Sequence, residues 1–319
     1  MEIRHLEDFL SHQIGFDDKA VALAVGSYVG GQEILANKRF IGYSQEIKAD
    51  GSTVGKLDNI SGKKISEYIN SRDISKKVRF NSEEKMPFNK PKFGWKYAGI
   101  FDDLDGSINP MIGGANLNYV GTGGVIHDEF EQQVFAAAYL PFLNKEEIFV
   151  AEKGKGTYVI TFSRDKMKEN KIKLSLEPAQ RNSLIESGWT TPNTLDAEQS
   201  LRNNGFYDLI GNAFAKDRVT GGIFQTVSGL KDSRQIVLNF AASHQADYCY
   251  LLLEEAGAEV IGQYGHPMDS TSNAMLSIAP SFTGDRKELK EKFRSSMMFL
   301  NEGGYRGWNP EAPLERVTG

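Results

Sequence analysis

The feature that most restricts the fold of this chain is the alternation of strand-like and helix-like segments along its 319 residues. Short runs rich in β-branched and aromatic residues, bounded by turn residues, are typical of strands. Apolar residues spaced three and four apart are typical of amphipathic helices. The alternation predicts a layered α/β fold and not a helical bundle or a β-sandwich. The expected strands cover residues 78–80, 117–120, 133–139, 148–151, 170–178, 183–187, 234–241 and 259–261, and residues 154–160 are expected to form a turn that leads into a further strand. The expected helices cover 3–35 with a break near 15–18, 57–69, 197–204 and 246–256.

Two glycines bear on the expected helices. Gly62 lies inside the helix expected over 57–69, where glycine costs about 1 kcal/mol relative to alanine. Gly257 follows the helix expected over 246–256, at the position where a left-handed cap favours glycine. A proline at position 178 marks the expected boundary between an N-terminal half, 1–178, and a C-terminal half, 179–319, of one domain.

Charge and composition exclude several classes of partner. The formal net charge of −5 disfavours general binding to nucleic acid or to an anionic membrane, so we expect neither. The N-terminal residues include early acidic side chains, and no segment approaches the roughly 18 apolar residues of a membrane span. Cys249 is the only cysteine, so no disulfide can form within the chain, and its apolar surroundings predict a buried thiol. We expect a cytoplasmic protein.

The segment FDDLDGSIN, residues 101–109, carries the clearest chemical signal. Asp102 and Asp105 follow an apolar run that is typical of a strand, and carboxylates at its end can converge on a divalent cation such as Mg²⁺. The backbone carbonyl of Leu104 can add a ligand. Gly106 and Ser107 then offer backbone N–H groups to an anion, particularly where a helix or turn begins. Carboxylates for a metal beside N–H groups for a phosphate together indicate a phosphate-ester site.

Other acidic residues precede this segment, and a plainer interpretation remains open. Glu83 and Glu84 follow the short strand expected over 78–80, and Asp58 follows the polar segment 48–56. Each of these, taken alone, is typical of a solvated loop. An acidic surface turn in some other α/β enzyme is the corresponding alternative for residues 101–109. The five histidines show no H-x-x-x-H pairing, so a zinc site is not expected.

Several segments, in order, resemble the superfamily of lithium-sensitive, magnesium-dependent phosphatases that includes inositol monophosphatases and fructose-1,6-bisphosphatases. The segment KADGSTVGKLD resembles the family's K-x-D-x-S-x-V-T-x-x-D pattern, SEE resembles its Glu-Glu loop, and FDDLDGSIN resembles its D-P-[IL]-D-G-[ST] signature. The later segments AEKGKGTYV and LLLEEAGAEVIGQYGHPMD are also similar to the family. The matches span about residues 48–270. The resemblance implies a five-layer αβαβα sandwich of the sugar phosphatase type, with the site between the two halves.

The same resemblance implies roles for individual residues. Glu83, Asp102 and the Leu104 carbonyl would hold a first Mg²⁺, and Asp102 and Asp105 would share a second with position 245, for two or three ions in all. The catalytic residues Asp58 and Ser107 would orient and deprotonate the attacking water, with Glu83 at the metal beside them. Backbone N–H groups of Gly106 and Ser107 would hold the substrate phosphate.

Three positions depart from the family pattern. Asp103 stands in place of a proline, which adds a charge beside the metal loop, and Gly55 stands in place of a threonine. Gln245 stands where the family has a metal-binding Asp or Glu, ten residues before Glu255. A neutral glutamine carbonyl can still coordinate a metal ion but lacks the negative charge of a carboxylate. The protein is then either an active enzyme that binds one ion more weakly, or a protein that has lost hydrolysis and only binds its phosphate ligand.

The expected activity is Mg²⁺-dependent hydrolysis of a small cyclitol, sugar or nucleotide phosphate monoester. Fructose-1,6-bisphosphatase and 3′(2′),5′-bisphosphate nucleotidase are the alternatives within this class, and a non-catalytic phosphate-binding homologue is the alternative outside it. Lys231, Arg234 and Arg218 can meet a second anion, although solvated surface charges are the plainer interpretation. The resemblance also implies a homodimer and inhibition by lithium.

Overall fold

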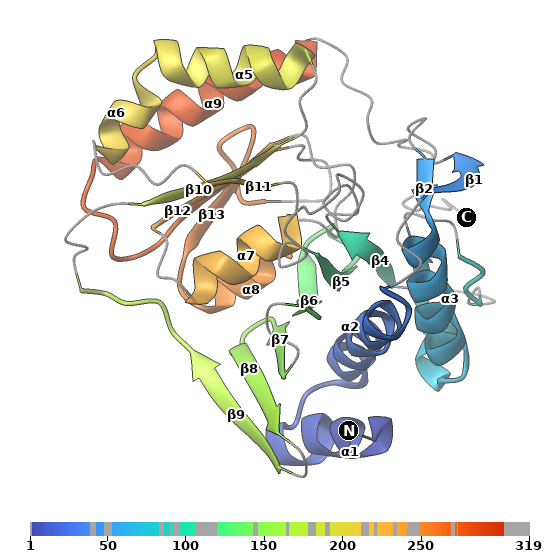
Figure 1. Ribbon diagram of the computed structural model, residues 1–319. Coiled ribbons are helices and arrows are strands. Elements are labelled where there is room, and N and C mark those ends of the chain that lie inside the picture. The colour runs from blue at the N-terminus through green and yellow to red at the C-terminus, as the bar shows by residue number, and fades with distance from the viewer. Residues whose placement is uncertain are drawn as a thin grey trace.

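The computed structural model of the chain shows five layers, in the order helices, sheet, helices, sheet, helices (Figure 1). Among the residues described, no helix is both long and apolar enough to cross a bilayer. The structure describes residues 2–38, 43–47, 53–82, 86–89, 91, 96–105, 120–142, 146–163, 166–177, 183–188, 192–211, 217–219, 222–231, 235–240, 249–268, 272 and 274–302.

The first helical layer and the larger sheet come from the N-terminal half. The layer consists of α1 (Ile3–Asp8), a π-helix (Phe9–Ile14), α2 (Asp18–Asn37) and α3 (Lys56–Asn70). The sheet has seven strands in sequence order; β3 and β4 are parallel, and every later pair is antiparallel. These strands are β3 (Val78–Ser82), β4 (Tyr97–Asp105), β5 (Gly121–His127), β6 (Gln133–Tyr139), β7 (Glu147–Glu152), β8 (Gly156–Ser163) and β9 (Lys166–Ile172).

The second half supplies the remaining layers. Helices α7 (Gly222–Lys231) and α8 (Leu251–Glu255) lie between the sheets, and α5 (Pro192–Asn203), α6 (Phe206–Ile210) and α9 (Arg286–Glu302) cover the outer face (Figure 1). The smaller sheet has the order β11-β10-β12-β14-β13, with β10 parallel to both its neighbours. Its strands are β10 (Leu184–Gly188), β11 (Asp217–Val219), β12 (Ile236–Phe240), β13 (Glu259–Gly262) and β14 (Ala274–Ile278). Two short pieces belong to neither of these sheets, the antiparallel pair β1 (Tyr43–Ile47) and β2 (Thr53–Gly55) and a 3₁₀-helix (Asp73–Lys76).

Three clusters of buried apolar side chains fill the four spaces between adjacent layers, because one cluster packs on both sides of the middle helices. The layered α/β prediction and the five-layer sandwich implied by the resemblance are therefore confirmed. The buried thiol of Cys249 is confirmed as well, since this residue is fully buried. The division into halves at residue 178 remains a prediction.

Three predicted elements differ from the structure. The strand expected over 170–178 is β9, which begins at Lys166 and ends at Ile172, where its pairing with β8 ends. The helix expected over 246–256 begins only at Leu251, because Cys249 has a φ of 39°, which a right-handed helix cannot contain. Residues 241–248 lie outside the described part. The strand expected over 117–120 is displaced, since β5 begins at Gly121 and residues 117–119 are not described. Its sequence GTGGVIH is rich in glycine, which is depleted in strands, and the pattern therefore gave no strand there.

The predicted glycine cap of α8 is confirmed. Gly257 has a φ of +107°, its N–H donates to the Glu254 carbonyl at 2.9 Å, and the Ala258 N–H donates to the Leu253 carbonyl at 3.0 Å. This pair of bonds is the Schellman arrangement that ends a helix. The Glu255 side chain accepts a bond from the Gly154 N–H at 2.8 Å, so the EEAG segment also anchors the turn between β7 and β8.

Glu254, in α8, gives a prediction about pH. Burial raises the pKa of its carboxyl from 4.5 to about 7, Lys153 opposes this shift, and Glu255 adds to it. The native protein then holds a proton that the unfolded chain releases between pH 4.5 and 7, so this residue makes stability fall as the pH rises through that window. Glu254→Gln should unfold with a free energy about 1–3 kcal/mol higher than the parent above pH 7, and equal to it near pH 4. Urea unfolding at both pH values checks this; an equal difference at the two would contradict it.

Candidate active site

The chemistry-bearing residues gather at the C-terminal end of β4. The strand begins with the apolar residues of 97–101 and ends with three aspartates, Asp102, Asp103 and Asp105, which are 2%, 1% and 6% exposed. Burying a carboxylate is costly unless hydrogen-bond donors or cations face it. Three buried carboxylates at one end of a strand therefore require hydrogen-bond donors or cations close to them.

A bulge determines which way these carboxylates point. Asp102 is paired with Gly123 and Asp105 with Gly121, so three steps on β4 match two steps on β5. In a regular strand, residues three apart point to opposite faces, and the extra residue of a bulge reverses this relation. Asp102 and Asp105 therefore share the face of the sheet that carries α7.

Asp103 points to the other face. A Cβ atom built on Gly62 of α3 would lie 2.5 Å from Asp103 Oδ2, so the Asp103 carboxylate packs directly against the helix backbone. The extra charge at this position therefore faces α3, on the opposite side of β4 from Asp102 and Asp105. This contact also explains why a glycine interrupts the α3 sequence.

Gly62→Ala should consequently destabilise the protein, by about 1–3 kcal/mol, because the new methyl group overlaps Asp103. At an exposed helix position the same change would stabilise by about 1 kcal/mol. Denaturant unfolding measures the effect. The loss should shrink in an Asp103→Ala background, and a gain in stability from Gly62→Ala alone would contradict the packing described.

The Asp102 and Leu104 side chains are fixed locally. The Asp102 Oδ1 atom accepts a hydrogen bond from the Leu104 N–H at 3.0 Å. The Leu104 side chain is buried with Ile34, Leu57 and Val120, so the apolar part of this residue is packed into the core. A local hydrogen bond and apolar packing thus both help to hold the bulged end of β4.

Asp105 is held by a helix from the other half of the chain. Its Oδ2 atom accepts a hydrogen bond of 2.6 Å from the backbone N–H of Ile223, in the first turn of α7. The positive end of the helix dipole favours a negative charge at this place. Asp105 and Ile223 are 118 residues apart, and no sequence pattern indicates that they meet.

Asp58 lies in the first turn of α3 and is 1% exposed. Gly62 follows it one helical turn later on the same face, and Gly62 contacts Asp103 of β4. The face of α3 that carries Asp58 is therefore the face that packs on the carboxylate end of β4. The predicted catalytic aspartate thus approaches this end of the strand from the α3 side.

The donors fit a hard cation. Asp102 and Asp105 supply carboxylate oxygens on one face, and Mg²⁺ prefers one or two carboxylates together with waters and phosphate oxygens. Within the described residues, no three His, Cys, Asp or Glu side chains group closely enough to hold a metal ion by themselves. The predicted residues Glu83, Gly106, Ser107 and Gln245 lie outside the described part of the chain.

The structure does not support Lys231 as a residue that binds a second anion of the substrate. This residue ends α7, about 12 Å along the helix from Ile223, and its ammonium group forms an ion pair with Glu147 of β7. The plainer interpretation, a charge at the protein surface, therefore fits Lys231. Arg234 and the side chain of Arg218 lie outside what the structure describes.

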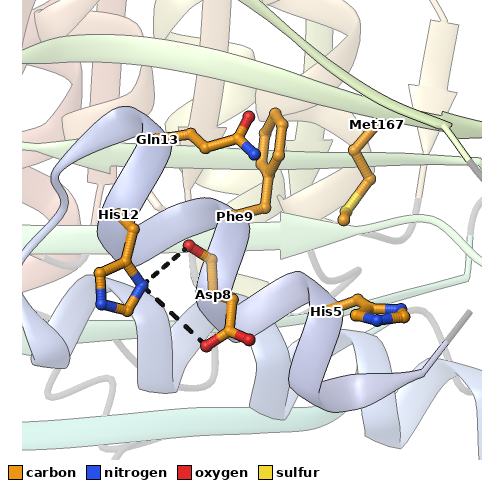
Figure 2. A pocket seen from close by; sticks show the side chains of 6 residues that line it. All are labelled: His5, Asp8, Phe9, His12, Gln13 and Met167. Carbon is orange, nitrogen blue, oxygen red and sulfur yellow. Dashed lines mark hydrogen bonds and ion pairs between the residues drawn. The ribbon is translucent and has the colours of Figure 1, made fainter.

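A pocket of about 580 Å³ occurs elsewhere, between the N-terminal helices and β9 (Figure 2). His12 Nδ1 lies 3.2 Å from the Asp8 carbonyl oxygen and 4.0 Å from its Oδ1, and both side chains are largely exposed. Strand β9 is five strand spacings from β4, roughly 24 Å at about 4.8 Å each. This pocket is therefore separate from the carboxylate end of β4. It is lined by His5, Asp8, Phe9, His12, Gln13 and Met167.

Solved structures resemble this chain over nearly its whole length. The extragenic suppressor protein SuhB from Bartonella henselae has a TM-score of 0.63 at 15% identity, covering 86% of this chain and 96% of that chain. The inositol monophosphatase from Anabaena has a TM-score of 0.61 at 14% identity, covering 89% and 95%. CysQ from Bacteroides thetaiotaomicron, a bacterial member of the inositol monophosphatase family, has a TM-score of 0.61 at 19% identity, covering 83% and 98%.

The chain has the inositol monophosphatase fold. No protein-family model matches the sequence, and no curated protein is detectably similar to it. The resemblance read from the short motifs is thus confirmed at the level of the inositol monophosphatase fold. At identities of 14–19%, the structural likeness establishes this fold alone, and the chemistry has to be argued from the residues.

Proposed function

We propose that this protein is a Mg²⁺-dependent phosphomonoesterase that hydrolyses a small cyclitol, sugar or nucleotide phosphate. The observation that carries the proposal is the bulge of β4, which brings the buried carboxylates Asp102 and Asp105 to one face. The inositol monophosphatase fold supports it, because proteins with this fold include inositol monophosphatases.

In the proposed reaction, separate residues of the chain bind the metal ions, orient the phosphate and take a proton from water. Asp102 and Asp105, with Glu83, the Leu104 carbonyl and Gln245, would bind the ions, and the N–H groups of Gly106 and Ser107 would orient the phosphate. Asp58 and Ser107 would position a water molecule and take its proton as it attacks phosphorus. Bound Mg²⁺ supplies a lowered pKa for that water and neutralises charge on the attacking and leaving oxygens.

Gln245 motivates the second candidate, a phosphate-binding protein that does not hydrolyse its ligand. A glutamine in place of a carboxylate lowers the negative charge that faces the ions and should weaken the binding of one of them. The proposed enzyme and the proposed binding protein differ in one property, the release of phosphate.

A substrate panel distinguishes these candidates. Inositol 1-phosphate, fructose 1,6-bisphosphate, 3′-phosphoadenosine 5′-phosphate and several sugar phosphates would each be incubated with the parent and with Gln245→Asp, in Mg²⁺. Release by the parent supports the enzyme and identifies its substrate class. Release by Gln245→Asp alone would instead support a binding protein that lost hydrolysis at this position.

A further inference from the structure

Helix α7 is fastened to both sheets. On the side of the smaller sheet, Gln225 Nε2 donates a 2.6 Å hydrogen bond to the Leu238 carbonyl of β12, and a Cβ on Gly229 would lie 2.7 Å from Val237 Cγ2. On the side of the larger sheet, the Ile223 side chain lies over β5. The position of α7 relative to the larger sheet therefore depends on its contacts with both sheets.

Two glycines of β5 permit the contact with the larger sheet. A Cβ on Gly121 would lie 2.9 Å from Ile223 Cγ2, 2.9 Å from Leu140 Cδ2 and 3.3 Å from Ile223 Cβ. A Cβ on Gly123 would lie 2.6 Å from Ile223 Cδ1 and 3.0 Å from the Ala137 carbonyl oxygen. Any larger residue at these positions would push the first turn of α7 away from the sheet.

The same place holds the Asp105 carboxylate. Gly121 is the register partner of Asp105 in the β4–β5 ladder, and the Ile223 N–H donates to Asp105 Oδ2 at 2.6 Å. The first turn of α7 lies close to β4 and β5, and this closeness allows both the packing of Ile223 on Gly121 and the hydrogen bond from Ile223 to Asp105. A hydrogen bond to a charged acceptor weakens steeply as its length grows and its angle bends.

We propose that Gly121 and Gly123 form a seat for the first turn of α7, and that the seated turn fixes the Asp105 carboxylate in its metal-binding orientation. The inference rests on the proposed function, in which Asp105 is a ligand. It makes Gly121, Gly123 and Ile223 positioning residues, which act through Asp105 and do not touch the substrate. Groups that orient a metal ligand are typically worth 10–100-fold in metal affinity.

Gly121→Ala tests the seat directly, because its methyl group would crowd Ile223 atoms close to the helix backbone. Mn²⁺, which also favours carboxylate oxygens, serves as the probe, with free Mn²⁺ followed by its electron paramagnetic resonance signal. We expect Gly121→Ala to bind Mn²⁺ about tenfold more weakly than the parent. Adding Ile223→Ala removes the crowded Cγ2 and keeps the N–H, and the remaining close contact is with the end of the Leu140 side chain, which does not belong to α7. The double variant should therefore recover most of the affinity that Gly121→Ala loses.

Gly124→Ala is the matched control. Gly124 lies on the same strand but faces α2, where its Cβ would lie 2.8 Å from Phe101 Cδ1 and 2.9 Å from Leu23 Cδ2. This variant should lose thermal stability while its Mn²⁺ affinity stays within about twofold of the parent. An equal loss of affinity in Gly124→Ala and Gly121→Ala would show a general disturbance of the sheet and would overturn the proposal.

Hydrogen exchange of the metal-free protein separates this inference from the proposed function. The protection of the residue 223 amide, measured against its intrinsic exchange rate, should fall at least about tenfold in Gly121→Ala and return to the parent value in the double variant, since its bond to Asp105 is lost in one and restored in the other. If the exchange pattern is observed but the parent protein binds no Mn²⁺, the result supports the seat and contradicts the proposed function. Unchanged exchange at Ile223 in Gly121→Ala would overturn the seat whatever the protein does with metal.

Discussion

Asp105→Asn is expected to lower Mg²⁺-dependent phosphate release about 10³-fold while the protein stays folded. The change removes one negative charge from the proposed metal site, and stabilisation of transition-state charge by a metal is worth several kcal/mol, or about three orders of magnitude in rate. The asparagine carbonyl can still accept the hydrogen bond from the Ile223 N–H, so the first turn of α7 keeps its partner on β4. Phosphate release at saturating substrate, together with the melting temperature, measures both effects.

Asp105→Ala supplies the control for that result. Alanine removes the charge and the acceptor, so the buried Ile223 N–H loses its partner, at a cost of about 1–3 kcal/mol in the free energy of unfolding. We expect both variants to lose at least about 10³-fold in phosphate release and only the alanine variant to be clearly less stable. Full activity of Asp105→Asn would contradict the metal site and would favour the plainer interpretation, an acidic turn.

Asp58→Asn is expected to lower kcat by about 10²–10⁴-fold, the usual contribution of a general base. The side chain is 1% exposed and lies on the face of α3 that packs on the end of β4. Because Asp58 is not a proposed metal ligand, Mn²⁺ affinity should remain near that of the parent. Steady-state kinetics and a Mn²⁺ titration separate the two properties, and an unchanged kcat would remove Asp58 from the proposed mechanism.

The layered α/β class could be predicted because many local patterns agree with the tertiary structure, although the sequence patterns did not predict α7, α9 or β14. The apolar face of residues 57–69 became α3, and the apolar run before Asp102 became β4. Strand β5 could not be predicted in this way. Its glycines have low strand propensity, and they are present because α7 approaches one face of the strand at Gly121 while Phe101 and Leu23 approach the other at Gly124.

The site itself was only partly visible in the sequence. The residue types of Asp102 and Asp105 indicated a cation, but a spacing of three in a regular strand would place them on opposite faces. Only the bulge, which depends on pairing with β5, brings them to one face. The approach of Ile223 to Asp105 depends on the packing of α7, and the short α8 depends on the left-handed backbone of Cys249.

The most direct test is a Mg²⁺ titration of phosphate release by the parent protein, on the substrate of the panel that it hydrolyses fastest, with a parallel series in EDTA. We expect release to rise with Mg²⁺ to a plateau, to stop in EDTA and to return when Mg²⁺ is added back. Phosphate release that is equally fast in EDTA and in Mg²⁺ would contradict the claim that the carboxylates of β4 serve a divalent cation.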